Sequence, residues 1–205
     1  MTTAVIIQAR MNSKRFPGKV MARLGDRSVL EHVIERSMNI GPQVMLAVPE
    51  GELELFMWVG PAGIWRFGGS ENDVLSRYLD IAIAQDIDII MRITADCPLL
   101  RPDLCRKVLN LYNECSCDYA AIGWPRGGFP KGYGCEVFSK SALRTAGKEA
   151  FSPKDREHVT TWIERNLRCV YLHNDKDESH LNYCVDYPED IPRLVALLDK
   201  PNKSE

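Results

Sequence analysis

The sequence lacks both a long hydrophobic run and a strong charge imbalance. No apolar stretch approaches the roughly 20 residues of a membrane-spanning helix, and the N-terminal Met-Thr-Thr-Ala does not resemble the basic start of a signal peptide. Among 205 residues, 26 Lys and Arg face 28 Asp and Glu, so the formal net charge is −2. We therefore expect neither nucleic acid nor a membrane as a partner, because both attract basic proteins.

Regularly spaced metal-binding cysteines are also missing. The seven Cys are an odd number scattered through apolar segments, which is typical of a reducing, cytoplasmic compartment. Cys115 and Cys117 form the only close pair, without a second pair at zinc spacing. The composition, 45% hydrophobic and 26% charged, is that of a globular chain. We expect one domain over residues 1–198 and a frayed polar tail over 199–205.

Short apolar runs alternate with helical periods along the chain. The expected strands cover residues 4–9, 43–48, 63–67, 87–93, 117–122, 135–139, 168–173 and 181–186. The expected helices cover residues 28–39, 51–59, 70–85, 101–114, 140–149, 153–166 and 188–198. This alternation predicts parallel βαβ units and an α/β fold, with a mostly parallel sheet flanked by helices.

Local signals mark where several of these helices begin. Ser28 and Glu31 have the spacing of a capping box, and Ser70 and Asp73 stand in capping positions. Pro102 falls in the first turn of its helix, where a missing N–H costs nothing.

A loop rich in cations follows the first expected strand. It contains Arg10, Lys14, Arg15 and Lys19. Open α/β sheets bind ligands outside the carboxyl ends of their strands. Asp96 and Asp186 also come directly after expected strands, so parallel neighbours would bring the loop and both carboxylates into one crevice.

Such a crevice suits a nucleoside triphosphate. Arg and Lys bind phosphates, and Mg²⁺ takes one or two carboxylates together with phosphate oxygens. Taken alone, however, the cations are also compatible with a solvated loop, and each Asp with a turn or a helix start. The residues by themselves leave these alternatives open.

The loop also resembles a known signature. "IIQARMNSKRFPGKV" matches A-R-x-x-S-x-R-x-P-x-K, and "GGSENDVLSRY", "RITADCPL", "DREHVT" and "VDYPED" continue the match in order. Over about residues 4–198 the chain resembles the sugar cytidylyltransferases. Within them it resembles the spore-coat polysaccharide biosynthesis F-type proteins, which are related to the acylneuraminate and 3-deoxy-manno-octulosonate enzymes.

The resemblance implies a nucleotide-diphospho-sugar transferase (Rossmann-like) fold and transfer of CMP from CTP to a sugar or sugar acid, with release of pyrophosphate. It also implies a homodimer, a cytoplasmic location, a role in surface or spore-coat polysaccharide synthesis, and Mg²⁺ held by Asp96 and Asp186. The implied catalytic residues are Arg10, Arg15, Lys19 and Asp96. The implied nucleotide-binding residues are Gln8, Ala9, Arg10, Ser13, Lys19, Ser70, Asp73, Val74, Arg92 and Thr94.

The acceptor side departs from the family pattern. Relatives often carry D-G-x-D-x-E where this chain has "KGYGCE", so Lys131 and Gly134 replace acids and only Glu136 remains. A Lys at this position favours an acidic acceptor. The implied substrate-binding residues are Tyr133, Glu136, Arg156 and His158; His158 is equally compatible with packing or a dimer interface.

Other functions remain possible at this point. A glycosyltransferase on this fold would carry a metal-binding D-x-D at the carboxyl end of a strand, whereas Asp86 and Asp88 stand at the start of one and Asp175 and Asp177 in a polar loop. A non-catalytic protein would not bind CTP. Cys97 as a nucleophile is disfavoured, because the neighbouring Asp96 raises a thiol pKa.

Overall fold

The computed structural model describes residues 1–125 and 127–198, and the predicted polar tail, residues 199–205, lies outside them. Within the described ranges, no helix is long and apolar enough to cross a membrane.

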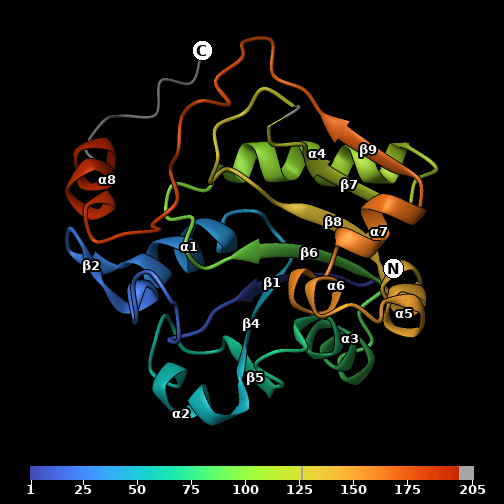
Figure 1. The fold of residues 1–205 in the computed structure, drawn as a ribbon, viewed down its shortest axis with the longest axis horizontal. Coiled ribbons are helices and arrows are strands. Elements are labelled where there is room, and N and C mark those ends of the chain that lie inside the picture. Colours follow the sequence, from blue (N-terminus) through green and yellow to red (C-terminus); the bar gives the residue numbers. More distant parts are fainter. Residues whose placement is uncertain (126, 199–205) are drawn as a thin grey trace.

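A seven-stranded sheet runs through the centre of the molecule in the order β5-β4-β1-β6-β8-β7-β9 (Figure 1). Its strands are β1 (Thr3–Gln8), β4 (Gln43–Pro49), β5 (Trp65–Gly69), β6 (Ile89–Thr94), β7 (Tyr119–Ile122), β8 (Glu136–Ser139) and β9 (Cys169–Leu172). β1, β4, β5 and β6 are parallel, and β9 is parallel to β7. The predicted mostly parallel α/β sheet is confirmed, but β8 runs antiparallel to both β6 and β7, which the alternation did not predict.

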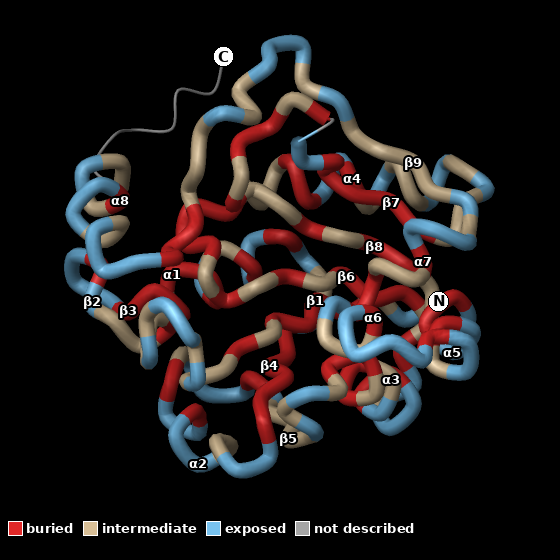
Figure 2. Tube along the Cα trace, in the orientation of Figure 1, coloured by how far each residue is buried: buried red, intermediate tan, exposed pale blue. Residues whose placement is uncertain are grey.

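Helices cover both faces of the sheet (Figure 1). One face packs against α1 (Val29–Met38), α2 (Leu53–Phe56) and α4 (Pro102–Glu114); the other packs against α3 (Val74–Ala84), α5 (Lys140–Glu149) and α7 (Thr161–Asn166). In β1, Val5 and Ile7 face the first layer, while Ala4 and Ile6 face the second. Because both faces are buried, as Figure 2 shows for the central strands, β1 is apolar at every position from Ala4 to Ile7.

A small third core holds the C-terminal helix near the carboxyl end of β6. A hairpin of β2 (Arg23–Leu24) and β3 (Arg27–Ser28), absent from the sequence prediction, packs with α8 (Asp190–Leu198). Leu24, Leu99, Val185 and Leu194 are buried together there. This packing anchors the chain on both sides of Asp186.

The predicted helix starts are confirmed where side chains bond to the backbone. Ser28 and Glu31 form the capping box of α1, and Pro102 opens α4. Asp73 caps α3 by accepting from the N–H of Ser76 at 3.0 Å, while Ser70 accepts from the N–H of Asp73. Because these bonds turn the backbone before Val74, α3 begins there and not at residue 70.

Each of two expected helices is divided into two shorter helical segments in the structure. The expected helix 51–59 is the 3₁₀ turn η2 (Glu50–Glu52) followed by the four-residue α2. The expected helix 153–166 is divided into α6 (Pro153–His158) and α7. Val159 adopts a left-handed φ of 64° between them with its side chain fully buried, so packing of this residue overrides helix continuation.

The prediction of a strand over residues 181–186 is wrong. Apart from a bridge between Lys131 and Asn182, this segment is a loop. Its backbone groups bond to loops instead of a ladder: Val185 N–H donates to the carbonyl of Asp96, and Cys184 N–H donates to the side chain of Asn182. Asp186 therefore reaches the sheet edge from a loop and not from a parallel strand.

Candidate active site

The cationic loop is folded back on itself directly after β1. The N–H groups of Ser13 and Gly18 both donate to the carbonyl of Met11, at 2.9 and 2.8 Å. Gly18 has a φ of 73°, a conformation that glycine adopts without strain. The following 3₁₀ turn, η1 (Lys19–Met21), therefore starts with Lys19 directed back toward the strand ends.

Lys19 joins the two predicted metal-binding carboxylates. Its Nζ lies 2.6 Å from Oδ2 of Asp96 and 3.6 Å from Oδ1 of Asp186, and it donates to the carbonyl of Val185 at 2.7 Å. Asp96 comes two residues after Thr94, the last residue of β6. The two aspartates thus converge on one cation, although only one of them follows a strand.

Asp186 is 6% exposed and contacts two further cations. Arg15 donates to Oδ1, and Nζ of Lys131 lies 2.8 Å from Oδ2. Asp190, at the start of α8, accepts from the N–H of Asp186 at 2.8 Å and fixes the turn. Burying a charged carboxylate costs desolvation free energy, and the surrounding cations offset this cost.

Asp96 is held in its charged form. Burial alone would raise its pKa, but the ammonium of Lys19 outweighs burial and lowers the pKa of this carboxyl below its ordinary value. Asp96 therefore stays ionised at neutral pH, as a metal ligand or phosphate-facing carboxylate must.

These groups line a cavity of about 470 Å³, which we call the cationic cavity. Its lining comprises Gln8, Ala9, Arg10, Ser13, Lys14, Arg15, Lys19, Val20, Thr94, Ala95, Asp96, Glu157, His158 and Asp186. Gln8 pairs with Thr94 across β1 and β6, so the cavity lies at the carboxyl ends of two parallel strands. All four loop cations and both aspartates are in one site.

Helix α6 closes one side of the cationic cavity. Arg10 pairs with Glu157 at 3.4 Å, and His158 lines the wall. Arg156 points elsewhere: it pairs with Asp73 at the start of α3. Of the residues implied for the nucleotide, Ser70, Asp73 and Val74 do not line this cavity, and Val74 is buried in the core.

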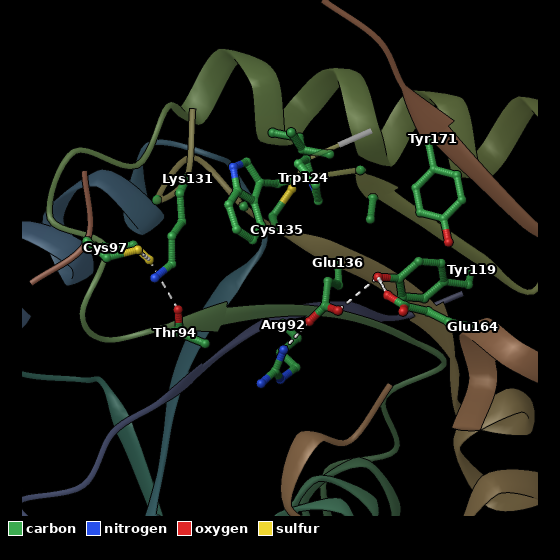
Figure 3. Close-up of a pocket in the computed structure, with 17 residues that line it drawn as sticks. Arg92, Thr94, Cys97, Tyr119, Trp124, Lys131, Cys135, Glu136, Glu164 and Tyr171 are labelled. Atoms are coloured by element: carbon green, nitrogen blue, oxygen red, sulfur yellow. Dashed lines mark hydrogen bonds and ion pairs between the residues drawn. The ribbon is translucent and has the colours of Figure 1, made fainter. Parts of the chain in front are cut away.

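A second cavity of about 490 Å³, shown in Figure 3, shares Thr94 with the first. Its lining comprises Arg92, Thr94, Cys97, Tyr119, Ala121, Ile122, Gly123, Trp124, Pro125, Lys131, Gly132, Gly134, Cys135, Glu136, Glu164, Tyr171 and Cys184. Gly132 has a φ of 102°, and a Cβ there would lie 2.7 Å from the carbonyl carbon of Tyr183. Only glycine allows this loop to approach the 182–184 segment so closely.

Glu136 is the centre of a hydrogen-bond network in the second cavity. One of its oxygens accepts from Tyr119 at 2.8 Å and from Thr160 at 2.7 Å, and the other accepts from Arg92. Arg92 also donates to Oε1 of Gln8 at 3.1 Å, which links this cavity to β1. Arg92 and Glu136, implied for nucleotide and substrate respectively, therefore form one ion pair on the cavity wall.

Tyr133 lies outside both cavity linings, although the resemblance implied substrate binding. Its ring contacts that of Tyr183, with centroids 5.1 Å apart, and the guanidinium of Arg101 lies 5.9 Å from its centre. The neighbouring Lys131 faces the cavity instead.

Cys97 is a packed thiol. Its sulfur lies 3.6 Å from that of Cys184. The hydrogen bond with Cys184, together with burial, raises the pKa of Cys97 well above its ordinary value. A thiol this difficult to ionise is a poor nucleophile.

The D-x-D pairs do not enter either cavity. Asp86 and Asp88 lie at the amino end of β6 and both pair with Lys140, at 2.9 and 3.6 Å. Asp177 accepts from the N–H of Ser179 in its own loop. The geometry therefore offers the glycosyltransferase alternative no metal site at these residues.

Sequence reasoning missed much of the second cavity. Tyr119, Glu164, Tyr171 and Cys184 were assigned only to expected strands or a helix, and Trp124 to a connecting loop. A polar Tyr within an otherwise apolar strand was the one available signal for Tyr119. Glu164 carried no signal, since an acidic residue on a helix is ordinary.

Known proteins resemble this chain along most of its length. Residues 4–199 match the family model described as cytidylyltransferase. The uncharacterized protein MJ1063 of Methanocaldococcus jannaschii is 34% identical over 165 residues, 78% of this chain and 66% of that protein, just under two thirds of its length. The spore coat polysaccharide biosynthesis protein SpsF of Bacillus subtilis is 29% identical over 95% of this chain and 85% of that protein.

Further matches agree with these. A 3-deoxy-manno-octulosonate cytidylyltransferase of Idiomarina loihiensis is 25% identical over 84% of this chain and 72% of that protein. Among solved structures, a cytidylyltransferase from Leptospira borgpetersenii superposes with a TM-score of 0.85 and 30% identity, covering 93% of this chain and 83% of that one. The predicted nucleotide-diphospho-sugar transferase fold is confirmed by this similarity.

Proposed function

Since the chain belongs to the cytidylyltransferase family, as the sequence resemblance predicted, we propose that it transfers CMP from CTP to a hydroxyl of a sugar acid and releases pyrophosphate. The enzyme class expected from the sequence, a CTP-dependent sugar cytidylyltransferase, is confirmed by the family match. Beyond this match, we propose that the acceptor is a sugar acid, that a metal ion is bound, and that individual residues have the roles given below.

One observation carries the nucleotide half of this proposal. Four cations of one loop and two aspartates line a single cavity at the carboxyl ends of β1 and β6. A triphosphate that enters it replaces the carboxylates as partner of Arg15 and Lys19. The same cations then stabilise the negative charge that develops on the leaving pyrophosphate, which is where such groups accelerate phosphoryl chemistry most.

The residues present fit a magnesium ion. Asp96 and Asp186 already share one cation, the ammonium of Lys19, so their oxygens converge. Two carboxylates with phosphate oxygens are the ligands that Mg²⁺ prefers. When bound, it would polarise the phosphate and lower the pKa of the attacking hydroxyl.

The second cavity is the proposed acceptor site. It meets the cationic cavity at Thr94, so a hydroxyl placed at this junction faces the phosphates. Lys131 lies at the same junction through its contact with Asp186, and its charge suits an acidic group beside the attacking hydroxyl. The relatives named for 3-deoxy-manno-octulosonate and for spore coat polysaccharide support a sugar acid destined for a polysaccharide.

Three related expectations stay predictions within this proposal. They are a cytoplasmic location, a homodimer, and a role in surface or spore-coat polysaccharide synthesis. Cell fractionation, sedimentation of the purified protein and the glycan composition of a deletion strain test them one by one.

The proposal is tested by identifying products. The protein, CTP, Mg²⁺ and a set of 3-deoxy sugar acids are incubated, and products are analysed by mass spectrometry. We expect a CMP-sugar with an equal amount of pyrophosphate. Consumption of a finished nucleotide-sugar without CTP-dependent pyrophosphate would instead support a glycosyltransferase.

A further inference from the structure

A large aromatic side chain lies half exposed on the wall of the second cavity. Trp124 is 48% exposed and lines this cavity together with Lys131 (Figure 3). The other tryptophans, Trp58, Trp65 and Trp162, line neither cavity. An apolar ring left in water forgoes the free energy of burial, which a ligand that covers the ring would recover. The exposed ring of Trp124 is therefore a candidate contact for the acceptor.

Hydrogen bonds hold the indole of Trp124 in place. Its Nε1–H donates to the carbonyl of Ser179 at 3.0 Å. The loop that follows is fixed as well, because the N–H of Asn174 donates to the carbonyl of Gly127 at 2.8 Å. The polar edge of the indole is thus already bonded, and what it offers to a ligand is the apolar ring. Since the ring is positioned in advance, stacking on it requires little ordering of the protein.

Lys131 links Trp124 to the proposed point of transfer. Its Nζ lies 2.8 Å from Oδ2 of Asp186 and 6.0 Å from the centre of the Trp124 ring, over the ring face. This distance is the outer limit of a cation–π contact and leaves the ring surface open, in agreement with its exposure. An acceptor with its hydroxyl beside Asp186 and its acid group on Lys131 therefore lies against this ring.

A closed sugar ring complements a fixed indole better than an open chain does. The hydroxyls of a sugar ring point outward, and its axial C–H bonds form an apolar face that can lie flat on an aromatic ring. This contact removes apolar surface from water and brings the C–H groups to the electron-rich face of the indole. An open chain has no rigid face, and ordering it on the indole costs conformational free energy.

Resting on the proposed function, we propose that Trp124 stacks on the C–H face of the acceptor's sugar ring and selects an acceptor in its closed-ring form. Lys131 pairs with the acid group of that ring, and Trp124 orients the ring so that its hydroxyl faces the phosphates. Trp124 is thus a specificity-determining residue of the acceptor site.

Tryptophan fluorescence tests the contact without turnover. The protein is titrated in EDTA, with and without CTP, against 3-deoxy-manno-octulosonate and against gluconate, an acid that cannot close into a hemiketal ring. We expect the ring-forming acid to shift the emission to shorter wavelength, because stacking removes water from the half-exposed indole. Gluconate, and CTP alone, should cause no shift. The shift should disappear in W124F and persist in W58F, which changes an indole outside both cavities.

Kinetics then measure what the contact contributes. With CTP and Mg²⁺, W124L should raise KM for the ring-forming acid by about tenfold or more, the size of effect that an apolar contact gives in substrate discrimination. KM for CTP should stay unchanged. W124F keeps an aromatic face and should restore most of the acceptor affinity. W58L is the matched control and should behave as wild type, and circular dichroism shows that each variant is folded.

The outcomes separate this inference from the function on which it rests. A fluorescence shift that persists in W124F, no shift in a wild-type protein that turns over the acid, or an unchanged acceptor KM in W124L would each contradict stacking on Trp124. A Trp124-dependent shift with CTP alone would assign the ring to the nucleotide base instead. In all of these cases CTP-dependent pyrophosphate release remains, so only the inference fails. If no acceptor releases pyrophosphate and CTP does not bind, the proposed function fails and the inference fails with it.

Discussion

The two cavities meet at Thr94 but are built differently. The cationic cavity lies at the carboxyl ends of the parallel strands β1 and β6 and collects a loop that directly follows β1. The second cavity is formed by β7, the antiparallel strand β8, and the segments around Lys131 and Cys184. The first depends on the general geometry of an α/β sheet, and the second on segments particular to this chain.

Their charges differ in the same way. The cationic cavity has four Lys and Arg against three carboxylates, whereas the second cavity has two cations and two carboxylates, of which Arg92 and Glu136 are paired. Excess positive charge suits the triphosphate of a nucleotide, a substrate that many enzymes have in common. Balanced charges at fixed positions suit recognition of one particular acceptor. We therefore assign nucleotide chemistry to the first cavity and acceptor specificity to the second.

The largest effect is expected at the two aspartates. D96A or D186A removes a carboxylate from the proposed metal site and one of the two aspartates that contact Lys19, so turnover should fall by about 10³-fold or more. Pyrophosphate release measures the rate, and circular dichroism shows that the fold is kept. D80N, an exposed position on α3, is the control. A near-wild-type rate in either alanine variant would exclude the proposed metal site.

The next effect separates the two cavities. K19M removes the cation that bridges Asp96 and Asp186. It should lower kcat/KM for CTP by about 10²-fold, the usual cost of one charge-stabilising group, for every acceptor alike. K107M, an exposed lysine on α4, should not change it. An effect confined to one acceptor would show that Lys19 acts in acceptor specificity. The assignment of nucleotide chemistry to the cationic cavity and acceptor specificity to the second cavity would then be wrong.

Lys131 should show the opposite pattern. K131E places a negative charge beside the proposed acid group, so KM for acidic acceptors should rise about tenfold or more relative to neutral ones. K148E on α5 is a charge-matched control outside both cavities. Unchanged acceptor preference in K131E would remove Lys131 from acceptor recognition.

The smallest effect concerns a residue that supports both cavities. Asp155 accepts from Ser152, Thr161 and Arg165, and so joins α6, which carries Glu157, to α7, which carries Glu164. The hydrogen bond from Arg165, followed by those from Thr161 and Ser152, lowers the pKa of Asp155. D155N should reduce the free energy of unfolding by about 1 kcal/mol at pH 7.

The pH dependence of that effect follows from the lowered pKa. A carboxylate with a lowered pKa in the folded state stabilises the protein above its unfolded pKa of about 3.9, and this contribution disappears as the pH falls through the folded-state value. Urea unfolding should therefore show the gap between wild type and D155N closing below about pH 4. A gap independent of pH would mean that charge is not its origin.

The sequence predicted the first cavity better than the second for a physical reason. The continuous apolar runs of β1 and β6 identify buried parallel strands, and the position of Arg10 and Asp96 at their ends follows from the general rule for such sheets. Asp186 was correctly grouped with them, although the strand expected before it is a loop.

The second cavity depends on contacts that local patterns do not encode. β8 inserts antiparallel between β6 and β7, which brings Glu136 beside Arg92. The break at Val159 turns α7 so that Glu164 reaches Tyr119, whereas an uninterrupted helix was expected. Tertiary packing therefore decides which polar side chains face the second cavity.

Pyrophosphate release measured for each of CTP, UTP, ATP and GTP against acidic and neutral sugars tests the central claim most directly. We predict Mg²⁺-dependent release that requires CTP and an acidic acceptor, with nucleotide choice unaffected by the acceptor offered. No release from any pair, together with no rise in the melting temperature on addition of CTP, would contradict the assignment of the cationic cavity to CTP.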